Sequence, residues 1–223
     1  DVYKRQVIYG GKGAGQLRYI SNVPISGADG KNYGNTFTFL EGERDWDIIP
    51  DSTSRYTLLN PLIGVTIYRI VAEDCVKNIC PYMCVFDTVI AECNLKDTGG
   101  VGLTASQNPA TGLVGPGYNV RIVNNRIDGV SPSSTIGGIY LFLGAYSTLE
   151  GSIAFGISVR NNVVTNTAVN PGKFYPHIGS DMVFPQGISI YTSVKEGTAS
   201  HRPVKFVIVE NNDVENSEYG IYF

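Results

Sequence analysis

Three segments of the chain align without gaps: VRIVNNRIDG (residues 120–129), ISVRNNVVTN (157–166) and VIVENNDVEN (207–216). Each has apolar residues at alternate positions, then an Asn-Asn pair, then a second alternating stretch. Alternation of period two places every second side chain on one face of a β-strand. Because asparagine tolerates the left-handed backbone conformation, the pair predicts a corner between two strands. The segments are therefore interpreted as copies of one bent, two-strand unit.

A unit of this size cannot bury its apolar face alone, so its copies are expected to stack about 4.8 Å apart, as strands in a sheet do. Stacking would bury a continuous column of Val and Ile side chains. The second asparagine of each pair would then join a ladder of side-chain amides made by Asn125, Asn162 and Asn212.

Two weaker copies are interpreted upstream, at residues 69–78 and 88–97, with Asp74 and Cys93 on the same rung. The rungs are then separated by 19, 32, 37 and 50 residues, so the longer repeats need insertions at their corners. A Gly followed by Leu or Ile comes after four of the five copies, at residues 102–103, 138–139, 187–188 and 220–221. A β-sandwich or barrel is the alternative, but it does not explain Asn-Asn at one offset three times.

On the Asn-Asn and Gly-Ile copies, residues 65–223 resemble the parallel β-helix proteins of the pectin-lyase-like fold. The resemblance implies an all-β chain that forms a single-stranded right-handed parallel β-helix, a solenoid with loop insertions at its corners. We expect residues 1–6 to be a non-native leader and residues 65–223 to be a β-helix truncated at its C-terminus. Residues 7–64 are expected to hold N-terminal coils (7–15 and 56–64) and an irregular loop (22–51).

Composition limits the function classes. The 223 residues include 17 basic and 20 acidic side chains, for a net charge of −3, which argues against a strongly basic nucleic-acid binder. No apolar run reaches the roughly 18 residues of a membrane helix, so no membrane insertion is expected. A hydrophobic content of 43% with 17% charged residues is typical of a globular chain.

The resemblance implies a polysaccharide partner and a glycoside hydrolase or polysaccharide lyase, including depolymerases of the phage tailspike type. It implies an extracellular, cell-surface or virion location, and the tailspike type implies a homotrimer. The alternative is a non-catalytic β-helix for glycan binding, adhesion or structure. The Asp-Asp pair and Gly-His-Gly segment of polygalacturonases are absent, and residues 97–102 match the Asn-Thr-Asp-Gly region only loosely. No cofactor is expected; a lyase would imply calcium, but no dense carboxylate run predicts a metal site.

The candidate catalytic residues come from one insertion and two turns. The insertion at residues 168–186 contains His177 and Asp181, a pair suited to general acid–base work near neutral pH. The turns at Asp97 and Asp128 are expected at the same corner, so Asp181 could approach either and form the carboxylate pair of a glycosidase. The alternative is an ordinary solvated loop.

Candidate binding residues follow from alternation, which directs Tyr140, Phe142, Tyr191 and Tyr222 outward. They are predicted to lie together across three stacked coils as a platform for sugar faces, or alternatively as an outer mini-core under the insertions. Tyr175 of the insertion and the outward Arg121 are further candidates, Arg121 for an anionic sugar. Two pairings are also predicted: an Arg160–Glu210 ion pair between neighbouring coils and, if the chain is exported, a Cys75–Cys93 disulfide.

Overall fold

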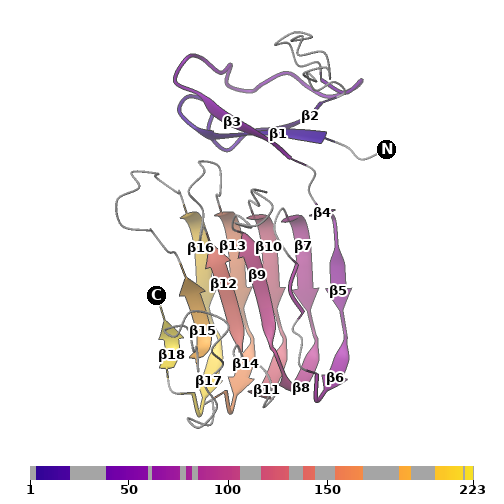
Figure 1. The fold of residues 1–223 in the computed structure, drawn as a ribbon, viewed down its shortest axis with the longest axis vertical. Coiled ribbons are helices and arrows are strands. Elements are labelled where there is room, and N and C mark those ends of the chain that lie inside the picture. Colours follow the sequence, from indigo (N-terminus) through magenta and orange to yellow (C-terminus); the bar gives the residue numbers. More distant parts are fainter. Residues whose placement is uncertain are drawn as a thin grey trace, which may run out of the picture. The chain divides into compact units, whose positions relative to one another are not determined.

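A computed structural model describes residues 4–20, 39–59, 62–75, 79–81, 85–105, 117–130, 138–143, 154–167, 186–191, 204–217 and 219–222. The chain divides into two compact units, Asp1–Pro61 and Leu62–Phe223. Every regular element among the described residues is a β-strand, so the predicted all-β class is confirmed for this part of the chain (Figure 1).

The described part of the second unit consists of three sheets of parallel strands. The first sheet contains β4 (Leu62–Ile63), β5 (Thr66–Tyr68), β7 (Val85–Ala91), β10 (Gly117–Val123), β13 (Ala154–Arg160) and β16 (Val204–Glu210). The second contains β6 (Val71–Glu73), β8 (Asn94–Thr98), β11 (Arg126–Val130), β14 (Val163–Thr165) and β17 (Asp213–Glu215). The third contains β9 (Val101–Ala105), β12 (Ile139–Leu143), β15 (Gln186–Tyr191) and β18 (Tyr219–Tyr222).

The chain visits these sheets in the same order each time. From β7 onward it runs through the first, second and third sheets and then returns to the first, beside the strand it left. Among the described residues, the first passage, through β4, β5 and β6, meets the third sheet only at the isolated bridge of Ile79 to Val101. We call one such passage a repeat. Parallel strands in stacked sheets are the arrangement that a β-helix or solenoid would have.

The predicted corner between the first and second sheets is present in five successive repeats. Its first residue has a positive φ each time, between 53° and 56°, in Arg69, Glu92, Asn124, Asn161 and Asn211. The second residue points its side chain inward at Cys93, Asn125 and Asn162, which are all buried. Asparagine suits the first position because it tolerates this conformation better than most L-residues do.

The predicted amide ladder is confirmed. Asn162 Oδ1 accepts from Asn125 N at 2.9 Å and from Asn125 Nδ2 at 3.0 Å, and Asn212 Oδ1 accepts from Asn162 N and Nδ2 in the same way. Each amide nitrogen also donates to a backbone carbonyl of the preceding repeat at 3.0 Å, as Asn162 Nδ2 does to Ile122 O. The side-chain oxygen Asn125 Oδ1 accepts a hydrogen bond from Cys93 N, which extends the ladder by one repeat.

The predicted alignment of the earliest copy is wrong by four residues. Val71 pairs with Asn94, so Ile70 rather than Asp74 stands on the rung below Cys93. The first two repeats are therefore offset by 23 residues, as the Arg69–Glu92 contact shows, and not by 19. Asp74 instead follows the last residue of β6 and has a positive φ there. Its sequence position therefore resembled that of an Asn-Asn corner.

The glycine signature is also shifted in one copy. Ile139 pairs with Val101 and with Ile188, so the first copy is residues 100–101 rather than 102–103. Gly100 has a φ of +77°, and a Cβ there would lie 2.1 Å from Gly138 O. Only glycine fits this position, because the next repeat passes directly against its backbone.

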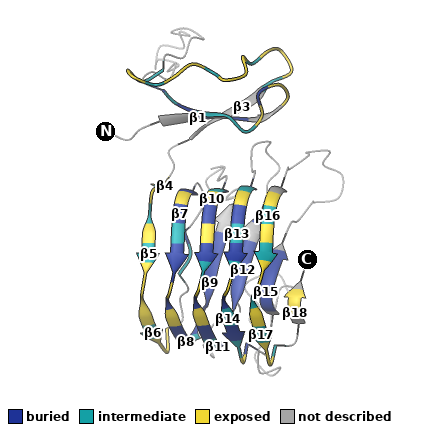
Figure 2. Cartoon of the chain, turned by 180° about the vertical axis from the view of Figure 1, so that it is seen from behind, coloured by how far each residue is buried: buried dark blue, intermediate teal, exposed yellow. Residues whose placement is uncertain are grey.

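The core lies between the three sheets and consists mainly of Val, Ile and Leu in columns that cross the repeats. One such column is Ile67, Ile90, Ile122, Val159 and Val209. Its middle members are fully buried, whereas Ile67 and Val209 are only partly buried (Figure 2). The apolar faces predicted from alternation are therefore packed as expected.

The first unit differs from the prediction. Its strands β1 (Lys4–Gly10), β2 (Leu17–Ile20) and β3 (Arg55–Leu59) form an antiparallel sheet in the order β2-β1-β3, so residues 7–15 and 56–59 are not further coils of the stack. Residues 11–16 are the turn region between β1 and β2.

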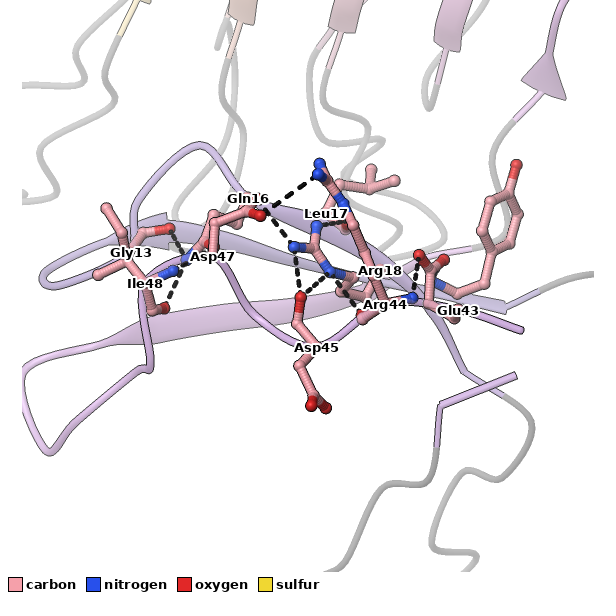
Figure 3. A network of polar contacts seen from close by, with 10 residues as sticks. Gly13, Gln16, Leu17, Arg18, Glu43, Arg44, Asp45, Asp47 and Ile48 are labelled. Atoms are coloured by element: carbon pink, nitrogen blue, oxygen red, sulfur yellow. Dashed lines mark hydrogen bonds and ion pairs between the residues drawn. The ribbon is translucent and has the colours of Figure 1, made fainter. Parts of the chain in front are cut away.

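A buried arginine fixes the irregular segment 39–51 of this unit. Arg18, whose side chain is 4% exposed, donates to the carbonyls of Arg44 and Asp45 and pairs with Asp47 at 3.0 Å (Figure 3). Its guanidinium also lies 5.2 Å from the ring centre of Trp46. Buried polar groups need such partners, so this network substitutes for a larger apolar core.

Candidate functional site

The corners of the stack differ in how much the length of the connecting segment varies from repeat to repeat. The corner from the first to the second sheet always takes two residues, whereas every long connection of the later repeats begins or ends at a third-sheet strand. These connections are residues 106–116, 131–138, 144–153, 166–185 and 192–203. A rigid scaffold with variable loops around one face is the usual construction of a binding or catalytic site. The outer face of the third sheet is therefore the candidate functional site.

The register of this sheet brings the predicted platform residues together along the backbone. Phe142 pairs with Tyr191, and Tyr140 pairs with Ser189, which pairs in turn with Tyr222. Tyr140 lies between Ile139 and Leu141, which both belong to the core cluster, so alternation puts Tyr140 on the outer side of the sheet. The predicted proximity of the four positions is confirmed for the backbone.

Tyr140 follows the alternative predicted for these positions, a covered outer layer, and not the exposed platform. Its side chain is only 3% exposed, and the ring lies over Gly102, where a Cβ would approach Tyr140 Cζ to 2.1 Å. Ser189, in the next repeat, is 4% exposed. The column of Gly102, Tyr140 and Ser189 is thus a covered outer layer, so a sugar would have to meet the neighbouring column of Phe142 and Tyr191.

The remaining predictions at this site lie outside what the structure describes. Phe142, Tyr191 and Tyr222 have described backbones but no described side chains. Tyr175, His177 and Asp181 lie in the undescribed part of the connection between β14 and β15. They stay predictions of catalytic and binding residues.

Asp97 and Asp128 lie within the strands β8 and β11 of neighbouring repeats, and not in the turns predicted for them; Asp128 pairs with Lys96, next to Asp97. Asp97 Oδ1 is directed at Gly129, where a Cβ would come within 2.2 Å of it. Asp128 accepts from Thr165 Oγ1 at 2.8 Å and from Asn166 Nδ2 at 2.6 Å. The Asn166 and Thr165 hydrogen bonds lower the pKa of Asp128, which therefore stays ionised at neutral pH. This arrangement makes Asp128 an anionic acceptor that joins two repeats and does not suit it to be a general acid.

The outer face of the first sheet holds the predicted ion pair and one further cation. Arg160 Nε lies 3.0 Å from Glu210 Oε1, which confirms the expected pairing. Arg121 is exposed, has Val89 and Ser158 as its neighbours in register, and makes no ion pair with another described residue. Arg121 is therefore available to an anion, but on a different sheet from the aromatic platform.

Cysteine chemistry differs from the expectation. Cys75, Cys80 and Cys93 are free thiols, so the predicted Cys75–Cys93 disulfide is not formed. The corrected register explains this, because Cys93 is buried on the amide rung while Cys75 is exposed beyond the end of β6. Burial raises the pKa of the Cys93 thiol, which makes it an unreactive core group.

Two kinds of feature, a metal-ligand group and a membrane-spanning helix, are absent from the described ranges. No three His, Cys, Asp or Glu side chains there are grouped so that they could hold a metal ion. No helix in the same ranges has the length and hydropathy to cross a membrane.

Sequence reasoning missed a column of rings at the start of the first-sheet strands. Phe86, Tyr118, Phe155 and Phe206 follow one another with centroid separations of 5.4, 5.3 and 6.2 Å. Burial raises the pKa of Tyr118 to about 12. The signal was present in the sequence, since the first three rings each stand six residues before the first corner residue of their repeat. Their mutual contacts make the column a structural element.

Comparisons with protein-family models, with curated proteins and with solved structures find no match to this chain.

Proposed function

We propose that Leu62–Phe223 forms a right-handed parallel β-helix that binds polysaccharide along the outer face of its third sheet. The handedness is supported by a general rule, because connections between parallel strands of one sheet are right-handed in about 98% of cases. Such a protein would act outside the cell or on a virion surface, where polysaccharides are accessible.

One observation carries the proposal: aromatic positions recur in register on the sheet at whose strands the long connections begin or end. Phe142 and Tyr191 are direct neighbours on β12 and β15. Adjacent strands are about 4.8 Å apart, so rings on two or three strands span a length comparable to one or two sugar rings. An aromatic face offers apolar contact to the C–H face of a sugar, while the connections supply polar groups.

Binding is favoured over catalysis by the described acids. Asp128 is held by Thr165 and Asn166, and both Asp97 and Asp128 lie on second-sheet strands, not on the third sheet. Hydrolysis or lyase chemistry would depend on Asp181 and His177, whose connection leads directly into β15. Cleavage is therefore a separate outcome of the same experiment.

The test uses the full chain in affinity electrophoresis through gels containing acidic or neutral polysaccharides. At least one polysaccharide is expected to retard the protein, and Phe142→Ala and Tyr191→Ala are expected to weaken that retardation about five- to tenfold, the effect of losing one ring contact of about 1 kcal/mol or slightly more. Tyr68→Ala is the matched control, because Tyr68 is an exposed ring on the first sheet.

Retardation by none of the polysaccharides would refute binding, and equal losses in Tyr68→Ala would refute the location. Release of reducing ends that disappears in His177→Ala and Asp181→Ala would add an enzymatic activity. An unsaturated uronate product would identify a lyase, and its absence a hydrolase.

A further inference from the structure

The edge of the stack formed by β5 and β6 is apolar and exposed. Val71 is 78%, Tyr68 45% and Ile70 44% exposed, and Figure 2 shows both strands exposed along the side of the stack. Among the described strands, none pairs with the free side of β6. The three residues of β6 include neither the lysine nor the proline with which natural sheets protect an edge, so this strand is a template for pairing with another strand.

The backbone of β6 has free hydrogen-bonding groups at Val71. In the later repeats the residue at this position donates its N–H to the preceding repeat, as Asn94 N does to Ile70 O and Arg126 N to Cys93 O, both at 2.8 Å. Val71 holds the same position in the first repeat, beside Asn94, and no described strand precedes it. Its N–H and C=O therefore both face the free edge, where they need partners.

The residues around Val71 are complementary to themselves in the antiparallel direction. If Val71 pairs with Val71 of a second copy, the two residues can exchange both N–H···O=C hydrogen bonds of an antiparallel pair. In that register Ile70 lies opposite Ala72 of the other copy. Ala72 packs against the core and Ile70 stands on the inner rung, so the apolar ends of two cores would meet.

The same register brings opposite charges together. Arg69 lies opposite Glu73 of the second copy, and the two-fold symmetry makes this contact twice. The side chains of Arg69 and Glu73 are 69% and 58% exposed although each already has one partner, so each has room for a second. Opposite charges directly across an antiparallel pair are favourable, and a displaced register would lose them.

We propose that two copies of this chain associate through β6, antiparallel about a two-fold axis at Val71. A two-fold contact uses the same surface on both copies, so the assembly closes at the dimer. It differs from the homotrimer that the tailspike type implies. The inference is independent of polysaccharide binding, because β6 belongs to the second sheet and the aromatic positions belong to the third.

A charge exchange tests the pairing in sedimentation velocity, where the unmodified chain is expected to be a dimer that dissociates on dilution. Arg69→Glu alone and Glu73→Arg alone each place like charges opposite each other at both contacts, so each is expected to raise the dissociation constant at least about tenfold. An equimolar mixture restores two opposite-charge contacts and is expected to form a heterodimer as readily as the unmodified chain dimerises. Glutamate fits the corner of Arg69, because Glu92 holds the equivalent corner with a φ of 53°.

Crosslinking tests the register itself. With the native cysteines replaced by serine, Val71→Cys is expected to give a disulfide-linked dimer on mild oxidation, because a hydrogen-bonded antiparallel pair has its Cα atoms about 5.5 Å apart. Val163→Cys is the matched control, since Val163 holds the same position in β14 between two paired strands, and it is expected to stay uncrosslinked.

Far-UV circular dichroism checks that each variant is folded. A monomeric or trimeric unmodified chain, a mixture of the two charge variants without heterodimer, or equal crosslinking of Val71→Cys and Val163→Cys would each overturn the proposal.

Discussion

The amide ladder predicts a graded loss of stability when its members are truncated. Asn162 is fully buried and makes four hydrogen bonds through its side chain: it accepts two from Asn125 and donates one each to Ile122 O and Asn212 Oδ1. A net contribution of about 1 kcal/mol per hydrogen bond gives about 4 kcal/mol for Asn162→Ala. Asn212 makes three such bonds but is partly exposed, so water replaces part of the loss and Asn212→Ala should cost about 1–2 kcal/mol.

The assay is urea unfolding followed by far-UV circular dichroism, with Trp46 fluorescence as a separate signal from the first unit. Asn161→Gly is the control: Asn161 is exposed with a φ of +56°, which glycine adopts readily, so a change within about 0.5 kcal/mol is expected. The Trp46 transition should not move in any variant whose effect is confined to the ladder. The reasoning would be refuted if Asn162→Ala cost no more than Asn212→Ala or Asn161→Gly.

Three further predictions concern contacts between repeats. Gly102→Ala should destabilise the chain because its Cβ would meet the Tyr140 ring at 2.1 Å, and the added change Tyr140→Ala should recover part of the loss in a thermal melt. Asp128 has a lowered pKa, so its stabilisation is complete above the ordinary carboxyl pKa of 3.8 and is lost as the pH falls through its folded value. The stability difference between the native chain and Asp128→Asn should therefore shrink only in acid, and a difference unchanged down to pH about 2 would contradict the assignment. The half-exposed Arg160–Glu210 pair should contribute less than about 1 kcal/mol in a double-mutant cycle and weaken with salt; a larger, salt-insensitive coupling would be inconsistent with its exposure.

Much of the stacked architecture could be predicted from the sequence because a few side chains satisfy a strict local requirement. The Asn-Asn pairs supply a left-handed corner residue followed by an amide that reaches both neighbouring repeats. Their offset therefore predicted the ladder and, through it, the Arg160–Glu210 contact.

The earlier repeats were misaligned because they meet the same requirement with other residues. Arg69 and Glu92 adopt the left-handed corner conformation although neither is asparagine, and their side chains form an exposed ion pair with each other. Ile70 occupies the rung position but has no side-chain amide, so the sequence does not mark this corner. Asp74 was therefore assigned to the rung in its place. The antiparallel sheet of the first unit had no periodic signal, and its buried Arg18 depends on carbonyls 26 and 27 residues away.

The site was predicted only in part. Alternation predicted the outward direction of Tyr140, but the burial of its ring depends on packing that alternation does not encode. The absence of a side chain at Gly102 leaves the space in which that ring lies. The contacts of Asp128 could not be predicted because its partners Thr165 and Asn166 belong to the next repeat, 37 and 38 residues later.

Disulfide trapping can show whether successive repeats pair in the register described above. Val123 and Arg160 are register partners on β10 and β13, and neighbouring strands hold paired residues within the range of Cα separations that a disulfide needs. With the native cysteines replaced by serine, Val123→Cys with Arg160→Cys is predicted to form an intramolecular disulfide rapidly on mild oxidation, whereas Val123→Cys with Ser158→Cys, displaced by two residues, is not. Equal trapping of both pairs, or trapping of the displaced pair alone, would contradict the stacked register.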